Sequence, residues 1–328
     1  MDLDERLRNV AVVGAAGKMG RGIALLLARE ALRIIARESS GREGAEGASG
    51  TPRLSLIDPA RAAHHGLVEY IMRHTVAQAL GDAPGDDGPR DGDREREALE
   101  RLLSLSTDLD GARGAKLVFE AAPENLRLKA DLLRDLRGLC PEDAIFLTNT
   151  SSIPIHVLEE ESGLRGRIIG FHFYNPPAVQ RLLELITTDS TPSEIDELGV
   201  RLAERLGKLV VRSADVAGFI GNGHFIREGA YALARAREIA DGGLGFEGAV
   251  RAIDIVTREA LLRPMGIFQL IDYVGIDVFA AIADVMSDHL EGEDLRHPLL
   301  DRMLASRRRG GQDPTGAQTD GFLRYEDG

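Results

Sequence analysis

The sequence predicts an α/β protein in two parts: a doubly wound, mostly parallel sheet flanked by helices, and then an all-helical domain. Three observations lead to this fold class. Short apolar runs rich in β-branched residues alternate with helical patterns over about the first 200 residues, which is typical of a parallel sheet. A glycine-rich turn joins the first run to the first helix. The later pattern is helical throughout, so we place the domains at residues 1–213 and 214–328.

Composition indicates a soluble globular protein that works in the cytoplasm. The 328 residues are 43% hydrophobic and 28% charged, and the net charge of −13 argues against general nucleic-acid binding, which needs a basic face. Cys140 is the only cysteine, so no internal disulfide can form and a reducing compartment fits. The acidic N-terminus has no signal-peptide pattern, and no apolar run approaches the ~18 residues of a membrane helix. We therefore expect no membrane segment, and the residue pattern does not require a metal.

The first apolar run, Val10–Val13, is expected to form a buried strand that ends in a glycine turn. The turn reads G-x-x-G-x-x-G, and apolar residues at helical spacing follow it. Strand, glycine turn and helix together suit a dinucleotide, because the backbone can approach the pyrophosphate closely and the helix N-terminus faces its charge. The residues expected to bind the cofactor in this turn are Gly14, Ala15, Gly17, Lys18, Met19 and Gly20.

An acidic residue at the end of the second strand binds the adenosine ribose in sites of this kind. Two candidates compete. Glu38 follows a possible strand at residues 32–35, and Asp58 closes the apolar run Leu54–Ile57. We favour Asp58, with the first helix running on to about Arg37. A carboxylate there favours NAD over NADP, because it accepts from the 2′-hydroxyl and repels a 2′-phosphate.

Two stretches of low complexity interrupt this part of the chain. Residues 38–52 are rich in Gly, Ser, Glu and Ala, and residues 81–95 are dense in Gly, Asp and Pro. Neither stretch has the periodicity of a helix or a strand. We therefore expect two flexible insertions at the surface.

His172 and Glu184 are the most informative pair in the chain, and each lies on a further expected strand. His172 stands near the end of the run Ile168–Phe173, just before an Asn-Pro-Pro sequence, and Glu184 lies within Leu182–Ile186. A histidine held by a carboxylate is a common general base near neutral pH. The pair is therefore a candidate for catalysis.

Ser151 follows another expected strand, at residues 144–147, and so joins His172 at the carboxyl edge of the sheet. Together these groups suit the oxidation of a secondary alcohol by a nicotinamide cofactor. His172 would remove the hydroxyl proton as hydride leaves for the cofactor, and Glu184 would orient the ring and stabilise the imidazolium. Ser151 would hydrogen-bond the substrate oxygen.

These residues resemble the L-3-hydroxyacyl-CoA dehydrogenase family, and in particular its 3-hydroxybutyryl-CoA dehydrogenases. The shared sequence motifs are Asn-Thr-Ser-Ser at 149–152, His-Phe-x-Asn-Pro at 172–176, the following Glu184, and Pro-Met-Gly with Val-Gly-Ile-Asp at 264–277. The resemblance implies a Rossmann-type NAD-binding domain and a helical domain that pairs two subunits into a homodimer. It also implies conversion of a 3-hydroxyacyl-CoA thioester to its 3-oxo form, and back, in fatty acid β-oxidation.

The resemblance implies roles for further residues. Glu124 and Lys129 match family positions that approach the nicotinamide half of NAD, and Asn175 would help to fix the nicotinamide or its loop. Asn222 would join Ser151 in binding the substrate oxygen. Glu120 stays open between this site and a favourable contact with a helix N-terminus.

The chain departs from the family in places that bear on the substrate. Ala217 replaces a usual proline, and Gly223 and His224 follow Asn222 where an arginine is usual. The stretch 81–95 is acidic, whereas the family binds CoA near there with Ser and Lys side chains. Three alternatives therefore stay open: a CoA-free hydroxy acid of the gulonate or carnitine type, a cofactor-binding homologue without turnover, and the dehydrogenase part of a bifunctional system.

Overall fold

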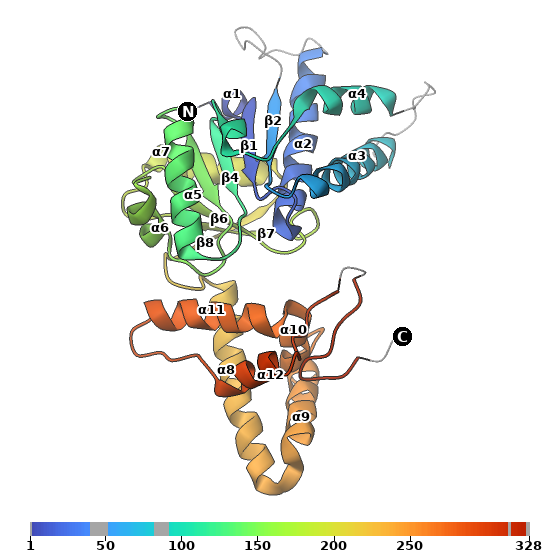
Figure 1. Cartoon of the computed structure of the whole chain (residues 1–328), viewed down its shortest axis with the longest axis vertical. Coiled ribbons are helices and arrows are strands. Elements are labelled where there is room, and N and C mark those ends of the chain that lie inside the picture. The colour runs from blue at the N-terminus through green and yellow to red at the C-terminus, as the bar shows by residue number, and fades with distance from the viewer. Residues whose placement is uncertain (1, 40–51, 82–91, 314–315, 326–328) are drawn as a thin grey trace. The chain divides into compact units, whose positions relative to one another are not determined.

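Eight strands form one sheet in the N-terminal part of the chain, in the order β3-β2-β1-β4-β5-β6-β7-β8 (Figure 1). All neighbouring strands are parallel except β6 and β7, which are antiparallel. The order 3-2-1-4-5-6 is that of a doubly wound dinucleotide-binding sheet, in which the ligand lies at the carboxyl ends where the order reverses. In this chain that point is between β1 and β4. The strands are β1 (Asn9–Val13), β2 (Arg53–Ile57), β3 (Leu103–Ser106), β4 (Leu117–Glu120), β5 (Ile145–Thr148), β6 (Ile168–Phe173), β7 (Leu182–Ile186) and β8 (Leu209–Ser213).

The computed structural model describes residues 2–39, 52–81, 92–313 and 316–325. The chain divides into two compact units. One holds residues 1–150 and 154–215, and the other holds residues 151–153 and 216–328. The short segment 151–153, which contains Ser151, thus belongs with the helical unit although its chain neighbours belong with the sheet.

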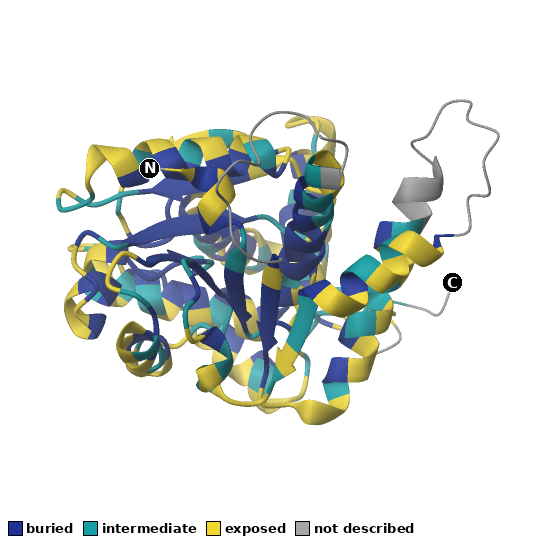
Figure 2. Ribbon diagram, turned by 90° about the horizontal axis from the view of Figure 1, so that it is seen from above, coloured by how far each residue is buried: buried dark blue, intermediate teal, exposed yellow. Residues whose placement is uncertain are grey.

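The central strands are buried on both faces because helices cover both sides of the sheet. Every residue of β4, β5 and β6 is buried, and Figure 2 shows the strands in dark blue against helices with exposed yellow faces. Two close-packed glycines show which helix covers which face. A Cβ added to Gly170 would lie 2.9 Å from Ile155 of α6 (Ile155–Ser162), and one added to Gly199 of α7 (Ser193–Arg205) would lie 3.1 Å from Ile169. Since residues 169 and 170 point to opposite faces of β6, α6 and α7 cover opposite sides.

The helices of this unit begin and end where the sequence supplies caps and amphipathic faces. For example, the side chain of Asn125 accepts from the N–H of Leu128 and starts α5, and Gly163 in the left-handed region ends α6. The helices are α1 (Leu3–Arg6), α2 (Lys18–Ser39), η1 (Arg61–Ala63), α3 (His64–Gly81), α4 (Asp93–Leu102), η2 (Leu109–Ala112), α5 (Leu126–Leu139), α6 (Ile155–Ser162) and α7 (Ser193–Arg205).

The second unit is helical and has its own apolar core. Phe268, Ile271 and Phe279 are fully buried in it, together with residues of the long helix α8. Its last described segment, residues 316–325, is held by Asp272, which accepts the N–H groups of Phe322 and Leu323 at 2.7 and 2.8 Å. The helices are α8 (Gly221–Ile239), the π-helical turn η3 (Ala240–Leu244), α9 (Gly245–Glu259), α10 (Ile267–Val274), α11 (Ile276–His289) and α12 (Pro298–Ala305).

The predicted fold class is confirmed, and the expected limits of the two insertions are wrong at their edges. α2 continues to Ser39, so Glu38 is helical and residues 32–35 do not form a strand. α4 begins at Asp93, so the second insertion ends before it. The remainder, residues 40–51 and 82–91, lies outside the described residues. Within the described ranges, no helix combines the length and apolar character needed to cross a membrane.

Candidate functional site

The glycine turn joins β1 to α2 with almost no space between strand and helix. Gly14 has a φ of +77°, and the carbonyl of Ile57 accepts the N–H groups of Gly14 and Ala15 at 2.9 and 3.1 Å. A Cβ on Gly20 would lie 2.0 Å from the carbonyl oxygen of Gly14. Only glycine permits this approach, and α2 begins at once with Lys18. The helix N-terminus therefore faces the carboxyl edge of the sheet, as a pyrophosphate requires.

Asp58 lies beside this turn, at the end of β2. Its two carboxylate oxygens accept the N–H of Ala16 at 3.0 Å and the N–H of Ala60 at 2.9 Å. An ionised carboxylate has about four acceptor positions, so it can accept from ribose hydroxyls as well as from these two N–H groups. Glu38 is paired with Arg8, which precedes β1 at the opposite, amino edge of the sheet. Of the two candidates, Asp58 is thus the one at the glycine turn. The turn and Asp58 together fit a dinucleotide.

A buried ion pair lies at the carboxyl ends of β4 and β5. Lys129 on α5 donates to both oxygens of Glu120, at 2.8 and 3.1 Å, and to the carbonyl of Ala122 at 3.0 Å. Thr148 donates to Glu120 at 2.6 Å, and Glu124 lies 3.5 Å from the same ammonium group. The side chains of Lys129 and Glu120 are 1% and 0% exposed.

Charge and burial oppose each other at Lys129. Burial lowers its pKa most strongly, but the carboxylates of Glu120 and Glu124 together outweigh burial, so the net pKa is raised above the ordinary value. The ammonium has three donors, and Glu120 and Ala122 accept them. Glu120 is therefore an internal partner of a lysine, a role that the sequence alone left open.

His172 and Glu184 meet across the antiparallel pair of β6 and β7. The register places them directly opposite one another, and Nδ1 of His172 lies 3.7 Å from Oε2 of Glu184. The two side chains are 9% and 2% exposed. Because Nδ1 faces the carboxylate, Nε2 is the ring atom suited to exchange a proton with a substrate.

Two polar contacts at this point were not singled out from the sequence. The hydroxyl of Tyr174 donates to Oε1 of Glu184, and Oδ1 of Asn149 accepts the backbone N–H of Phe173 at 2.9 Å. The two-residue period of a strand could have indicated Tyr174, because it places residue 174 on the same face as His172. The contact of Asn149 depends on how β5 and β6 are paired, which no local pattern reveals.

Ser151 and Asn222 come together in the helical unit. Asn222, in the first turn of α8, donates from Nδ2 to the carbonyl oxygen of Ser151 at 3.0 Å. Asn175 is half-buried in the loop after β6. Lys208 holds that loop, since its ammonium donates to the carbonyls of Pro177 and of Gln180, the latter at 2.8 Å.

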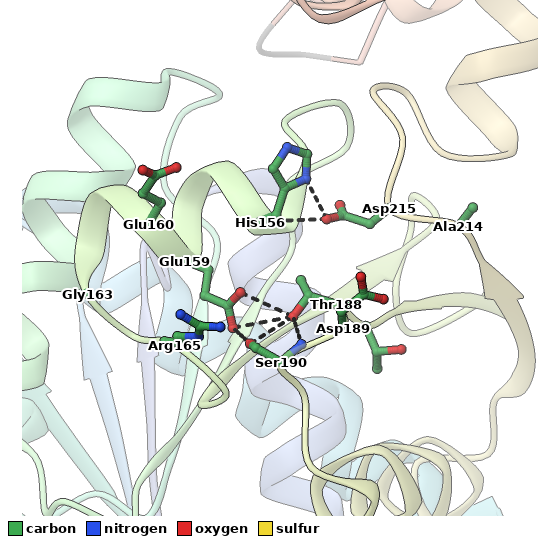
Figure 3. A pocket seen from close by; sticks show the side chains of 11 residues that line it. His156, Glu159, Glu160, Gly163, Arg165, Thr188, Asp189, Ser190, Ala214 and Asp215 are labelled. Atoms are coloured by element: carbon green, nitrogen blue, oxygen red, sulfur yellow. Dashed lines mark hydrogen bonds and ion pairs between the residues drawn. The ribbon is translucent and has the colours of Figure 1, made fainter.

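A polar pocket of about 890 Å³ lies elsewhere on the first unit, beside α6 (Figure 3). His156 and Asp215 pair there at 2.7 Å, and Asp215 also accepts the first N–H groups of α6. Glu159 accepts from the hydroxyls of Thr188 and Ser190. These bonds cap α6 and hold the turn after β7, and none of the predicted site residues lines this pocket.

Comparison with known proteins decides the family. Residues 9–216 match the model of the 3-hydroxyacyl-CoA dehydrogenase NAD binding domain, and residues 218–320 match that of the C-terminal domain. The chain belongs to the 3-hydroxyacyl-CoA dehydrogenase family. It is therefore an oxidoreductase whose cofactor is NAD.

Relatives and solved structures cover nearly the whole chain. A 3-hydroxybutyryl-CoA dehydrogenase of Mycobacterium tuberculosis is 31% identical over 324 residues, which are 97% of this chain and 100% of that protein. The crystal structure of M. tuberculosis FadB2 matches with a TM-score of 0.72 at 29% identity, over 97% and 99% of the two chains. That of (S)-3-hydroxybutyryl-CoA dehydrogenase from Ralstonia eutropha matches with 0.74 at 25%, over 98% and 99%.

Proposed function

We propose that the protein interconverts a 3-hydroxyacyl-CoA and the corresponding 3-oxoacyl-CoA, with His172 as the general base. The observation that carries the proposal is the buried pairing of His172 with Glu184 in a chain that matches both domains of the family. The names of the relatives favour a short acyl chain, since several are 3-hydroxybutyryl-CoA dehydrogenases.

The proton transfer follows from the placement of the ring. Nε2 of His172 accepts the proton of the substrate's 3-hydroxyl, and this general-base catalysis contributes roughly 10²–10⁴-fold. Glu184, facing Nδ1, stabilises the imidazolium that results. NAD, when bound, would supply the acceptor for the hydride that leaves the same carbon atom. In the reverse direction the imidazolium returns its proton to the oxygen of the 3-oxo group.

Ser151 and Asn222 are proposed to hold the reacting oxygen. The bond from Asn222 to the backbone of Ser151 fixes the two residues relative to each other. A hydroxyl and an amide held in this way can donate to the oxygen that carries charge as the alcohol becomes a ketone.

The cofactor is proposed to lie along the carboxyl edge of β1, β2 and β4. The six turn residues from Gly14 to Gly20 named above would hold the pyrophosphate, and Asp58 would accept from the ribose. Glu124, Lys129 and Asn175 would lie toward the nicotinamide. Lys129 donates to Glu120 and Ala122, and Glu124 lies 3.5 Å from its ammonium group. We therefore infer that Lys129 acts by holding the carboxylates of Glu120 and Glu124 in place.

One assay tests the central claim. We expect the protein to oxidise NADH with acetoacetyl-CoA, and His172→Ala to lower kcat about 10²–10⁴-fold. His289→Ala, an exposed histidine on α11 that bonds its own helix, is the matched control and should leave kcat unchanged. Activity on CoA-free 3-oxo acids alone would overturn the thioester substrate. Equal activity in His172→Ala would overturn the role of the histidine, and no activity with either substrate would indicate a homologue without turnover.

We further propose that the helical unit forms a homodimer. A cavity of about 380 Å³ with mainly apolar walls lies between α8 and α9. Three of the residues that line it, Tyr231, Val256 and Leu261, are 65%, 58% and 55% exposed. An apolar surface of this kind favours a protein partner. Val256→Asp should convert the dimer to a monomer in sedimentation analysis, whereas the control Val278→Asp on α11 should not. A monomeric unmodified protein would overturn the proposal.

A cytoplasmic location is also proposed. Its support is the single, buried cysteine, Cys140, whose pKa burial raises to about 11 and which is therefore unreactive. Fractionation of producing cells tests the location, and recovery from a secreted or membrane fraction would contradict it.

A further inference from the structure

Tyr174 contacts the proposed general-base pair, yet the proposed reaction does not use it. Its hydroxyl donates to Oε1 of Glu184, while Oε2 of the same carboxylate lies 3.7 Å from Nδ1 of His172. The rings of Tyr174 and His172 are 5.2 Å apart, centre to centre. One buried carboxylate therefore lies between two groups that can donate a proton to it.

The pleat of the sheet produces this arrangement. Tyr174 directly follows β6, and the continued alternation of side chains places it on the same side as His172. Glu184 is directly opposite His172 in the register of β6 and β7. A residue two positions along is its diagonal neighbour, within reach of a long aromatic side chain.

The contacts that Glu184 makes with Tyr174 and with His172 are unequal. A phenol hydrogen bond to an ionised carboxylate is charge-assisted and draws the negative charge toward the bonded oxygen. The contact with His172, at 3.7 Å, is longer than the ~3.0 Å of an N–H···O hydrogen bond. Burial, followed by Glu184 itself, raises the pKa of Tyr174 well above its usual value, so the hydroxyl remains a donor at neutral pH.

We propose that Tyr174 is a positioning residue that competes with His172 for the carboxylate of Glu184, and thereby sets how firmly the histidine holds a proton. With the hydroxyl present, the carboxylate is held partly away from the imidazole. With the hydroxyl removed, its full charge can approach Nδ1 and stabilise the imidazolium more strongly. The proposal rests on the general-base role of His172.

Three other charged groups of the first unit each have a partner of their own. Glu120 on β4 is held by Lys129 and Thr148. Glu159 on α6 accepts from hydroxyls after β7, and Lys208 before β8 donates to loop carbonyls. On β8 the neighbour of Glu184 is Val211, which is apolar. Because the variants below leave all these groups in place, differences between variants report on Tyr174 and Glu184.

The direct test measures the pKa of the His172 imidazole by NMR titration of the protein without substrate. Because the net contribution of one hydrogen bond is modest, Tyr174→Phe should raise this pKa by about half a unit to one unit. The control Tyr273→Phe removes the same atom from an exposed ring on α10 and should leave the pKa unchanged. An unchanged or lowered pKa in Tyr174→Phe would overturn the proposal.

A double-mutant cycle shows whether the effect passes through the carboxylate. In the Glu184→Gln background, Tyr174→Phe should shift the pKa of His172 by much less than it does alone. Equal shifts in both backgrounds would contradict competition for Glu184. Because the titration needs no turnover, it decides the role of Tyr174 even where the thioester assay fails.

The pH dependence of the oxidation and reduction rates provides a second test, because a purely structural role of Tyr174 would not shift it. His172 must be neutral to oxidise the alcohol and protonated to reduce the ketone. In Tyr174→Phe the acid limb for oxidation and the alkaline limb for reduction should both move to higher pH. Well below the oxidation midpoint, the oxidation rate should fall about three- to tenfold, while reduction well above its midpoint should rise by a similar factor. Changes of the same sign in both directions would overturn the proposal.

Discussion

Two buried acid–base pairs lie in the first unit and differ in how closely their partners approach each other. Lys129 and Glu120 at the end of β4 are in direct contact at 2.8 Å, and both side chains are at most 1% exposed. His172 and Glu184, on β6 and β7, are nearly as buried but face each other at 3.7 Å. In the first pair the ammonium has all three of its donors accepted by the chain.

The difference separates an ion pair that supports the fold from the pair that we propose moves a proton. A lysine whose donors are all accepted keeps its proton, as its raised pKa reflects, and it locks the helix α5 to the ends of two strands. A histidine near a carboxylate that is shared with a tyrosine can exchange its proton at Nε2 without breaking the packing around it. Burial alone would not have distinguished the two pairs.

Removing the cation of the first pair should have the largest effect on stability. In Lys129→Met the carboxylate of Glu120 stays buried without its partner, which costs about 3–5 kcal/mol of unfolding free energy. Denaturant unfolding measures this loss. Lys116→Met, which removes a partly exposed pair with Asp143, is the control and should cost less than about 1 kcal/mol. Similar losses of unfolding free energy in Lys129→Met and Lys116→Met would contradict a special structural role for the buried pair.

Neutralising the acid of the second pair should affect turnover more than stability. Glu184→Gln keeps the shape of the side chain and removes the charge that favours the imidazolium. We expect kcat to fall about 10²-fold, equivalent to about 3 kcal/mol, because the charge matters most when His172 carries the proton. Unfolding should change by less than in Lys129→Met. A variant that unfolds readily but retains its turnover would contradict the comparison.

A third buried acid, Asp272, has neutral partners and should give a pH-dependent stability. Burial is the main cause that raises its pKa to about 6, against the N–H groups of Phe322 and Leu323 and the hydroxyl of Tyr325. Because the folded-state pKa is above the ordinary value of about 4, its stabilisation is fully present below pH ~4 and is lost as the pH rises through ~6. The expected loss is about 2–3 kcal/mol.

Unfolding measured between pH 4 and pH 7 checks this value. The unmodified protein should lose the stated free energy relative to Asp272→Asn, which cannot titrate at that position. Asp277→Asn, an exposed residue on α11, serves as the control and should follow the unmodified protein. The same pH dependence in the protein and in Asp272→Asn would show that Asp272 remains ionised throughout.

Much of the sheet could be predicted because its evidence is local. Apolar runs, the glycine turn and the cap positions lie within a few residues of the elements that they define, so strand and helix order followed directly. The preference for Asp58 over Glu38 was of this kind: it required only that α2 continue past residue 35, and it does so to Ser39. The antiparallel direction of β7 was harder to predict, because strand direction depends on the path of the loop between β6 and β7.

The sequence by itself determined the fold class, the place of the glycine turn and the residues that carry the family resemblance, because each depends on adjacent residues. Only the tertiary structure decided that Glu120 is held by Lys129 and that Tyr174 shares Glu184 with His172. These contacts depend on strand register and on which helix covers which face. Register and packing are set by the burial of the whole sheet, so no single segment records them.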